Sequence, residues 1–333
     1  MSPLVSRRRI IGITAAAAGL SLLPIGQAAR AEARLVTWQG HAMGAAATLQ
    51  IHHHDRAAAE RLVERSIAEL RRMEEIFSLY RDDSALSALN RQGMLVAPPT
   101  ELVALLGECG RYGALTGGAF DPTVQALWTL YRDHFTTPGA DPRGPSEVAL
   151  RSALERVGFG HVVFDRNRIA FAHRGMGLTL NGIAQGYVTD RVVDILRGGG
   201  ITSSLVDMGE SRAIGAHPDG TPWRVGIADP DHPERINGVL ETVDRAVATS
   251  GAYGFRFDPD GRFNHLLDPR TGTSARLYRS VTVVMPTATG ADALSTAFSL
   301  LPEEAIGDTL RRIGTGEVRL TTTSGDKRTI LAA

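Results

Sequence analysis

The segment 264–272 concentrates side chains that can do chemistry: the imidazole of His265, the carboxylate of Asp268, the guanidinium of Arg270 and the hydroxyl of Thr271. They surround an apolar pair, and a proline and a glycine among them break the regular backbone, which predicts a turn at the end of a strand. A turn that presents these groups together suits recognition of a phosphate ester or a proton transfer. A solvated turn after a strand explains the same residues, so the segment by itself leaves both interpretations open.

A second chemical pattern lies near the C-terminal end, where residues 290–297 predict the start of a helix. Asp292 and Thr296 are four residues apart and therefore share one helix face. A carboxylate and a hydroxyl at this spacing offer the hard oxygen ligands that Mg²⁺ prefers. Capping of the helix by Asp292 is the structural alternative, and the sequence does not separate the two.

Two turns that contain glycine complete the set of candidate ligand contacts. Residues 179–187 predict a strand that runs through Gly182 into a helix, and the free N–H groups at such a helix start form a ready anion site. The segment matches neither a dinucleotide-binding nor a Walker pattern. In the other turn, residues 116–123, Asp121 is typical of a helix N-cap, and the two glycines before it allow a ligand to approach the backbone closely.

Helices and strands from both halves must position these groups. Apolar residues at helical spacing predict a long helix that begins after an Asp55 N-cap and ends at about Phe77. The three histidines before it, residues 52–54, alternate in direction along a strand and so cannot all bind one metal ion. Further helices are expected over residues 84–90, 100–115, 146–157 and 183–196, and strands over residues 45–51, 162–164, 169–171, 178–180, 204–208, 223–228, 239–243, 246–249, 256–257, 266–267 and 281–285.

This pattern predicts an α+β fold of two closely joined lobes of mixed sheet and helices. The helices are expected largely in the first half and the sheet in the second. A polar loop rich in proline and glycine, near 136–146, is the expected connection between the lobes.

Length and composition bound the class of protein. The chain has 333 residues, of which 43% are hydrophobic and 22% charged, as expected for one large domain or two closely joined lobes. Its 36 basic and 36 acidic residues cancel, which gives no support for a nucleic-acid or membrane-surface partner. The single cysteine, Cys109, excludes an intrachain disulfide and a cysteine zinc cluster, and its apolar helical surroundings predict a buried thiol.

Residues 1–31 predict a twin-arginine export signal rather than part of the fold. The pattern Ser-Arg-Arg-Arg-Ile-Ile at 6–11 precedes an apolar run, and Ala-Arg-Ala at 29–31 offers a cleavage site. The run is too short and too rich in alanine and glycine for a membrane span, so no stable membrane insertion is expected after cleavage. The mature chain is expected to begin near Glu32 and to lie in the periplasm, with an uncleaved anchor as the alternative.

Several of these segments, taken in order, resemble the ApbE family of FAD:protein FMN transferases. The resemblance rests on Met43-Gly44, on residues 78–80 with Ser84 and Asn90, and on residues 118–123, 182–187, 248–251, 265–272 and 291–296. Together they span nearly the whole mature chain, which implies a single domain over residues 32–333.

The resemblance implies an enzyme that moves FMN from FAD to a threonine or serine hydroxyl of a partner protein, with AMP leaving and Mg²⁺ required. It implies that the flavin lies in the cleft between the lobes, and that the residues around flavin and adenosine are Met43, Tyr80, Ala119, Phe120, Asp121, Thr179, Gln185 and Leu266. The implied Mg²⁺ ligands are Asp292, Thr296, the backbone carbonyl of Gly182 and, in addition, Ser295.

The chain departs from the family pattern at Thr179, Asn181 and Gln185, and it carries Asp-Met-Gly-Glu at 207–210 where the family tends to have Gly-Gly-Asp. The first three replacements remove charges beside the expected FAD, although Thr179 and Gln185 can still hydrogen-bond it. The run Thr-Leu-Asn-Gly-Ile-Ala-Gln-Gly at 179–186, with the twin-arginine pattern, looks like the branch associated with nitrous-oxide reductase maturation. The acceptor there would be the membrane flavoprotein of that system.

His265 is the expected general base for the acceptor hydroxyl, because its unperturbed pKa lies nearest to working pH. Asp268 is expected to orient it or to act as the base itself, and Arg270 to stabilise the phosphate or only to fix the turn. Two other functions use the same residues. One is hydrolysis of FAD to FMN and AMP with water as acceptor, and the other is a non-catalytic periplasmic flavin carrier.

Overall fold

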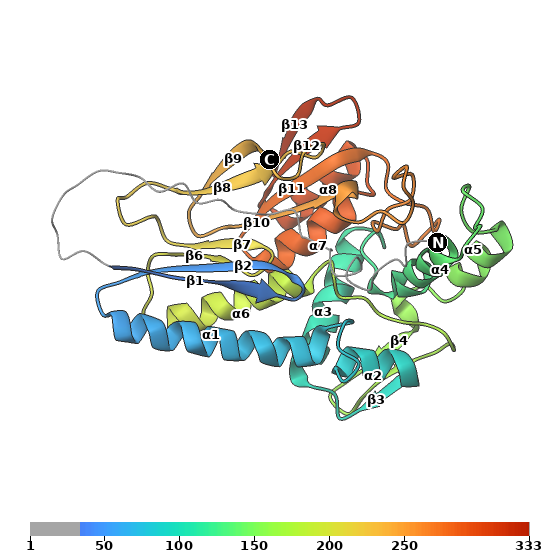
Figure 1. The fold of residues 1–333 in the computed structure, drawn as a ribbon, viewed down its shortest axis with the longest axis horizontal. Helices are drawn as coiled ribbons and strands as arrows, with labels where there is room; N and C mark the ends of the chain where they lie inside the picture. The colour runs from blue at the N-terminus through green and yellow to red at the C-terminus, as the bar shows by residue number, and fades with distance from the viewer. Residues whose placement is uncertain (1–33, 333) are drawn as a thin grey trace, which may run out of the picture.

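The structure is a computed structural model that describes residues 34–332, and it has an α+β fold (Figure 1). The expected export signal, residues 1–31, and the expected start of the mature chain at Glu32 lie outside the described residues. The helices are α1 (Arg56–Phe77), α2 (Ala85–Gln92), α3 (Thr100–Leu115), α4 (Gln125–Thr136), α5 (Glu147–Leu154), α6 (Ala184–Gly198), α7 (Ala288–Phe298) and α8 (Glu303–Ile313). The strands are β1 (Arg34–Ala42), β2 (Ala45–His53), β3 (Met94–Val96), β4 (Val162–Phe164), β5 (Arg168–Phe171), β6 (Ser204–Asp207), β7 (Ser211–Ile214), β8 (Trp223–Ala228), β9 (Ile236–Thr242), β10 (Ala246–Gly251), β11 (Tyr278–Met285), β12 (Glu317–Thr322) and β13 (Lys327–Leu331).

The largest sheet takes strands from both ends of the described chain. Its order is β1-β2-β6-β7-β10-β11-β12-β13, and each neighbouring pair is antiparallel. The β1-β2 hairpin joins the strands of the second half through β6, with Leu49 opposite Val206. The sequence pattern placed the sheet largely in the second half of the chain. The large sheet also contains β1 and β2 from the first half. The three-stranded sheet β3-β5-β4 and the β8-β9 hairpin are separate.

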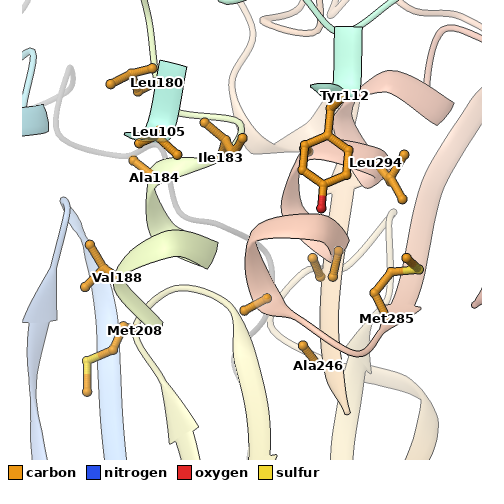
Figure 2. Packing of buried hydrophobic residues seen from close by; sticks show 14 of the residues in the cluster. Leu105, Tyr112, Leu180, Ile183, Ala184, Val188, Met208, Ala246, Met285 and Leu294 are labelled. Atoms are coloured by element: carbon orange, nitrogen blue, oxygen red, sulfur yellow. The ribbon is translucent and has the colours of Figure 1, made fainter. Parts of the chain in front are cut away.

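Helices pack against this sheet and enclose the main core. α1 begins as predicted at Asp55, whose carboxylate accepts a hydrogen bond of 3.1 Å from the backbone N–H of Ala58. It packs on the β1-β2 hairpin and on α6, while α6 packs on α7 and α7 packs on β10 and β11 (Figure 1). Figure 2 shows part of the buried cluster, with Leu105 from α3, Val188 from α6 and Leu294 from α7.

The contact between α6 and α7 depends on a glycine. A Cβ atom at Gly186 would lie 2.3 Å from the backbone oxygen of Ala288, well inside contact distance. This close approach lets the backbone N–H of Gly186 donate to Oδ2 of Asp292 at 3.0 Å. The start of α6 is thereby joined to the middle of α7, which brings the two predicted ligand segments together.

Residues 178–180 do not form the strand that the sequence predicted. The side chain of Asn90 bonds both the N–H and the carbonyl of Leu178, at 2.8 and 2.9 Å. The N–H of Thr179 donates to the backbone oxygen of Pro122 at 2.8 Å. A side chain and a loop therefore satisfy backbone groups that a neighbouring strand would otherwise satisfy.

The predicted strands at 256–257 and 266–267 are reduced to isolated bridges, one between Arg256 and Asn264 and one between Leu267 and Ser274.

Other local predictions are confirmed. Cys109 is buried in α3, and burial raises the pKa of its thiol. Within the described part of the chain, no helix has the length and apolar character needed to cross a membrane.

Candidate active site

A cavity of about 990 Å³, counting the space at its open mouth, lies between α6, α7, the end of β10 and the loop 264–272. Residues from both halves of the chain line it. Most of the predicted site residues line the cavity, namely Ala119, Phe120, Asp121, Thr179, Gly182, Gln185, His265, Leu266, Asp292 and Thr296. Four predicted residues do not line it: Met43, Tyr80, Asp268 and Ser295.

The lining is acidic. Asp121, Glu210 and Asp292 contribute carboxylates, and among the described residues that line the cavity there is no lysine or arginine. Both oxygens of Asp121 already have partners, since they accept backbone N–H groups of Thr123 at 2.8 Å and Phe159 at 2.9 Å. The other two carboxylates have no cationic side chain in the lining to balance them. An anionic ligand such as a diphosphate therefore needs a cation here.

The oxygen cluster, made of the predicted Mg²⁺ ligands Gly182, Asp292 and Thr296, lines the cavity. A Cβ atom at Gly182 would lie 2.8 Å from Oγ1 of Thr296, so glycine is needed for the backbone to approach this hydroxyl. Asp292 is buried, and burial, together with the nearby Asp190 carboxylate, raises its pKa to about 7 despite the hydrogen bond from Gly186. A bound cation would offset this penalty, because it stabilises the ionised form. The carboxylate, hydroxyl and carbonyl oxygens are of the chemical type that Mg²⁺ prefers.

Ser295 lies behind this cluster. Its hydroxyl donates to the backbone oxygen of Asp292 at 2.9 Å and lies 2.7 Å from the hydroxyl of Ser250, outside the cavity lining. In this position it supports the α7 segment that carries Asp292. Direct ligation of a cation by Ser295 stays a prediction that this arrangement does not favour.

His265 faces the cavity from the loop 264–272. Its Nδ1 lies 3.2 Å from the backbone oxygen of Phe255. Because a carbonyl oxygen only accepts, Nδ1 carries the proton in this contact and Nε2 keeps a free lone pair. Burial lowers the pKa of His265, so the ring is neutral at neutral pH and able to accept a proton.

Asp268 does not orient His265. Both oxygens of its carboxylate accept hydrogen bonds from the guanidinium of Arg270, at 2.9 and 2.7 Å, and the backbone N–H of Arg270 donates to it at 2.8 Å. Burial raises the pKa of Asp268, but the hydrogen bonds from Arg270 outweigh burial and hold this pKa below its ordinary value. The expected orienting contact is therefore wrong in this structure, since the carbonyl of Phe255 takes that place. The Asp268–Arg270 pair fixes the turn instead.

Asn264 also shapes this loop, which sequence reasoning missed. It is buried, and its side-chain NH₂ donates to the backbone oxygen of Ala275 at 3.0 Å. Its side-chain oxygen accepts the N–H of Leu266 at 3.1 Å, and its backbone N–H donates to the hydroxyl of Ser274 at 2.9 Å. These bonds hold Leu266 and His265 toward the cavity.

Met43 and Tyr80 lie outside the cavity lining. Met43 occupies the turn between β1 and β2 with φ of 51°, and its N–H donates to Glu74 at 2.9 Å. A Cβ atom at Gly44 would lie 3.8 Å from the Tyr80 ring, so this turn lies beside Tyr80. A side-chain hydrogen bond links Tyr80 to Asn181, which lines the cavity. The two predicted residues are thus connected to the cavity through Asn181.

Glu210 is a charged lining residue that the ligand predictions missed. It follows Gly209 in the turn between β6 and β7, and the backbone of Gly209 lies against the side chain of Gln185. The departure from Gly-Gly-Asp at 207–210 was the available signal, because it places a carboxylate in this turn. Only the tertiary structure shows that this carboxylate reaches the cavity.

Comparison with known proteins agrees with this geometry. A model of the ApbE family matches residues 43–319. The chain belongs to the ApbE family. It is therefore an enzyme of the transferase class.

The similarity extends over most of the chain. An FAD:protein FMN transferase of Treponema pallidum (strain Nichols) is 36% identical over 259 residues, which cover 71% of this chain and 70% of that protein. One of Escherichia coli (strain K12) is 30% identical over 311 residues, covering 90% of this chain and 88% of that protein. The apo crystal structure of the Pseudomonas stutzeri flavinyl transferase ApbE superposes with a TM-score of 0.76 at 28% identity, covering 90% of this chain and 96% of that chain.

Proposed function

We propose that the chain transfers FMN from FAD to a threonine or serine hydroxyl of an acceptor protein, with AMP as the leaving group and Mg²⁺ as the required cation. The observation that carries this proposal is that one cavity of this ApbE-family chain contains both a set of oxygen atoms that can bind a cation and a histidine that can accept a proton. The oxygen cluster of Gly182, Asp292 and Thr296 can hold a cation, and His265 offers a neutral imidazole.

The reaction is a phosphoryl transfer, in which positioning and charge stabilisation dominate. The acceptor oxygen forms a bond to the phosphorus of the FMN half, while the bond from that phosphorus to the bridging oxygen breaks and AMP leaves with that oxygen. Nε2 of His265 takes the proton of the acceptor hydroxyl. Asp292, Thr296 and the carbonyl of Gly182 would hold Mg²⁺, which supplies Lewis-acid stabilisation of diphosphate charge.

The other lining residues bind and orient the substrate. Phe120 and Leu266 present apolar surface that suits the flavin and adenine rings. Thr179 and Gln185 present polar groups that can bond ribityl, ribose or phosphate oxygens. Residues 249–251, at the end of β10, also line the cavity.

Hydrolysis of FAD to FMN and AMP is the second candidate, because water in place of the acceptor hydroxyl would use the same base and the same cation. A flavin carrier is a weaker candidate, since binding without chemistry would not require a buried carboxylate and hydroxyl placed to hold a cation.

The test is to incubate the purified protein with FAD, Mg²⁺ and a candidate acceptor domain, and to measure the acceptor mass. Transfer adds the mass of a covalently attached FMN and releases AMP in equal amount. Release of AMP without acceptor protein would identify a diphosphatase, and FAD binding with neither product would identify a carrier.

We also propose that residues 1–31 direct export by the twin-arginine route, and that the enzyme acts in the periplasm as a single domain over residues 32–333. We further propose that its acceptor is the membrane flavoprotein of nitrous-oxide respiration. The support is the twin-arginine pattern and the sequence run at 179–186. Fractionation of cells that express the chain, with and without substitution of Arg7 and Arg8 by lysine, tests the export route. Flavinylation assays with that membrane protein test the acceptor.

A further inference from the structure

Glu210 is held in a tight turn with its side chain directed into the active-site cavity. The carboxylate of Asp207 accepts the N–H of Gly209 at 3.0 Å and the hydroxyl of Ser211 at 2.8 Å, which closes the turn. The hydroxyl of Thr189, on α6, donates to the backbone oxygen of Glu210 at 2.9 Å. The turn is therefore fixed from two sides, and the Glu210 side chain lines the cavity with only 3% of the residue exposed.

One oxygen of this carboxyl group has no partner. Oε2 of Glu210 is buried and makes no hydrogen bond within the described chain. A buried polar atom without a partner costs about 1–3 kcal/mol, and more when it is charged. Burial, followed by the carboxylates of Asp292 and Asp207, raises the pKa of Glu210. A fixed, unsatisfied carboxyl group directed into a cavity is the arrangement expected where a ligand supplies the missing partner.

No side chain supplies that partner. The buried guanidinium of Arg212, on β7, bonds Asp190. Asp190 is further bonded by the backbone N–H groups of Ala288 and Thr289, at 2.8 and 2.9 Å. Nε of Arg212 makes no hydrogen bond within the described chain, and Arg212 does not line the cavity. The cavity lining, in the part of the chain that the structure describes, holds no lysine or arginine. Glu210 and Asp292 thus present two carboxyl groups to one cavity without a fixed positive charge.

We propose that Glu210 and Asp292 form a two-carboxylate cation subsite that holds a divalent cation before FAD enters. The inference rests on the proposed function, and it adds to the predicted ligands Gly182, Asp292 and Thr296 a second carboxylate supplied by the β6-β7 turn. A site with one carboxylate holds Mg²⁺ largely through the phosphates of its substrate. A second carboxylate supplies the charge that the phosphates would otherwise provide, so the cation binds the free enzyme.

The experiment measures cation binding without FAD. The purified full-length protein is titrated with Mn²⁺, and free Mn²⁺ is followed by electron paramagnetic resonance. Mg²⁺ is then used to displace it. Glu210→Gln keeps the shape of the side chain and removes its charge, and we expect about 10–100-fold weaker Mn²⁺ binding, the loss typical when a group that tunes a metal site is removed. Asp292→Asn should lose binding entirely.

Asp207→Asn is the matched control. Asp207 is a buried carboxylate in the same turn, but both of its oxygens are bonded within the turn and it does not line the cavity. An asparagine can accept the same N–H bond from Gly209 and donate to Ser211. Its Mn²⁺ affinity should stay close to that of the unsubstituted protein, which separates loss of a ligand from loss of a nearby buried charge.

Thermal unfolding gives a second readout that a purely structural role would not produce. In EDTA, Glu210→Gln should melt at or above the temperature of the unsubstituted protein, because it removes an unpaired buried carboxyl group. Added Mg²⁺ should raise the melting temperature of the unsubstituted protein by mass action and leave that of Glu210→Gln nearly unchanged.

Unchanged Mn²⁺ affinity in Glu210→Gln would overturn the inference, and so would failure of the unsubstituted protein to bind Mn²⁺ without FAD. If the variant bound Mn²⁺ normally but bound FAD weakly, Glu210 would be a flavin contact and the inference would also be wrong. The two proposals can also fail separately. If Glu210→Gln lost Mn²⁺ binding but the unsubstituted protein flavinylated no acceptor, the result would support the cation subsite and contradict the proposed function.

Discussion

Replacement of His265 by alanine should slow FMN transfer while FAD still binds. The structure leaves Nε2 of His265 as the free basic nitrogen, because Nδ1 donates to Phe255, and burial keeps the ring neutral. A positioned general base contributes about 10²–10⁴-fold to a rate. At about 1.4 kcal/mol for each tenfold change, this corresponds to a barrier increase of about 3–5 kcal/mol. The substitution also removes one hydrogen bond to a backbone carbonyl, worth about 0.5–1.5 kcal/mol of folding free energy, which is too little to unfold the protein.

The assay compares the rate of covalent FMN attachment, followed by acceptor mass, with FAD affinity measured from flavin fluorescence. His134→Ala is a control, because His134 lies on α4, is bonded to the backbone of Asp141, and does not line this cavity. It should transfer FMN at the normal rate. Near-normal transfer by His265→Ala would remove His265 from the mechanism, and a parallel loss of FAD affinity would show that it binds substrate rather than acting as a base.

The same histidine sets the expected pH dependence. Burial lowers the pKa of His265 below its ordinary value of 6.5. The imidazole therefore stays neutral and able to accept a proton at pH 6.5, and the transfer rate should fall only when the pH drops below the lowered pKa. With Mg²⁺ saturating, so that Asp292 stays ionised, a rate that already declines between pH 7.5 and 6.5 with the slope of one proton would contradict this assignment. The same acid limb in His265→Ala would contradict it as well.

Further predictions concern the contacts that build the site. Gly186→Ala should lower the melting temperature strongly, because its Cβ would lie 2.3 Å from a backbone oxygen of α7; Gly198→Ala on the same helix meets no atom within 4 Å and should leave the melting temperature equal or higher. Gly182→Ala should weaken Mg²⁺ binding, measured by titration calorimetry, because its Cβ would displace the hydroxyl of Thr296; unchanged affinity would remove Gly182 from the cation site. Asn90→Ala removes both bonds to the segment before α6 and should cost about 1–3 kcal/mol of unfolding free energy, measured by urea denaturation; a cost near zero would show that water replaces them.

Sequence reasoning succeeded where the cause of a structure is local. The N-caps at Asp55 and Asp121 were readable, because a side-chain oxygen bonds an N–H two or three residues later. The approximate ranges of the helices and of several strands were predicted from the periodicity of apolar residues, which is also a local property of the sequence. The β1-β2 hairpin as part of the large sheet was not readable, because strand pairing across more than 150 residues leaves no local signal.

It failed where a distant group changes the role of a segment. Residues 178–180 have strand-like composition, but Asn90 bonds their backbone and removes the need for a strand partner. Asp268 lies close to His265 in sequence, yet its carboxylate accepts hydrogen bonds from Arg270. The ring of His265 instead contacts the backbone oxygen of Phe255. Spacing along a chain predicts which groups are near, but not which of them meet.

The amino-acid sequence by itself determined the chemical inventory of this protein: an imidazole in a turn, a carboxylate and a hydroxyl on one helix face, and a glycine before another helix. Side-chain type and short-range spacing are sufficient for this. The tertiary structure decided that these groups share one cavity, since the contact between Gly186 and Asp292 joins residues 106 positions apart. It alone directed Glu210 into that cavity, because burial and the absence of a balancing charge depend on packing between segments far apart in the chain.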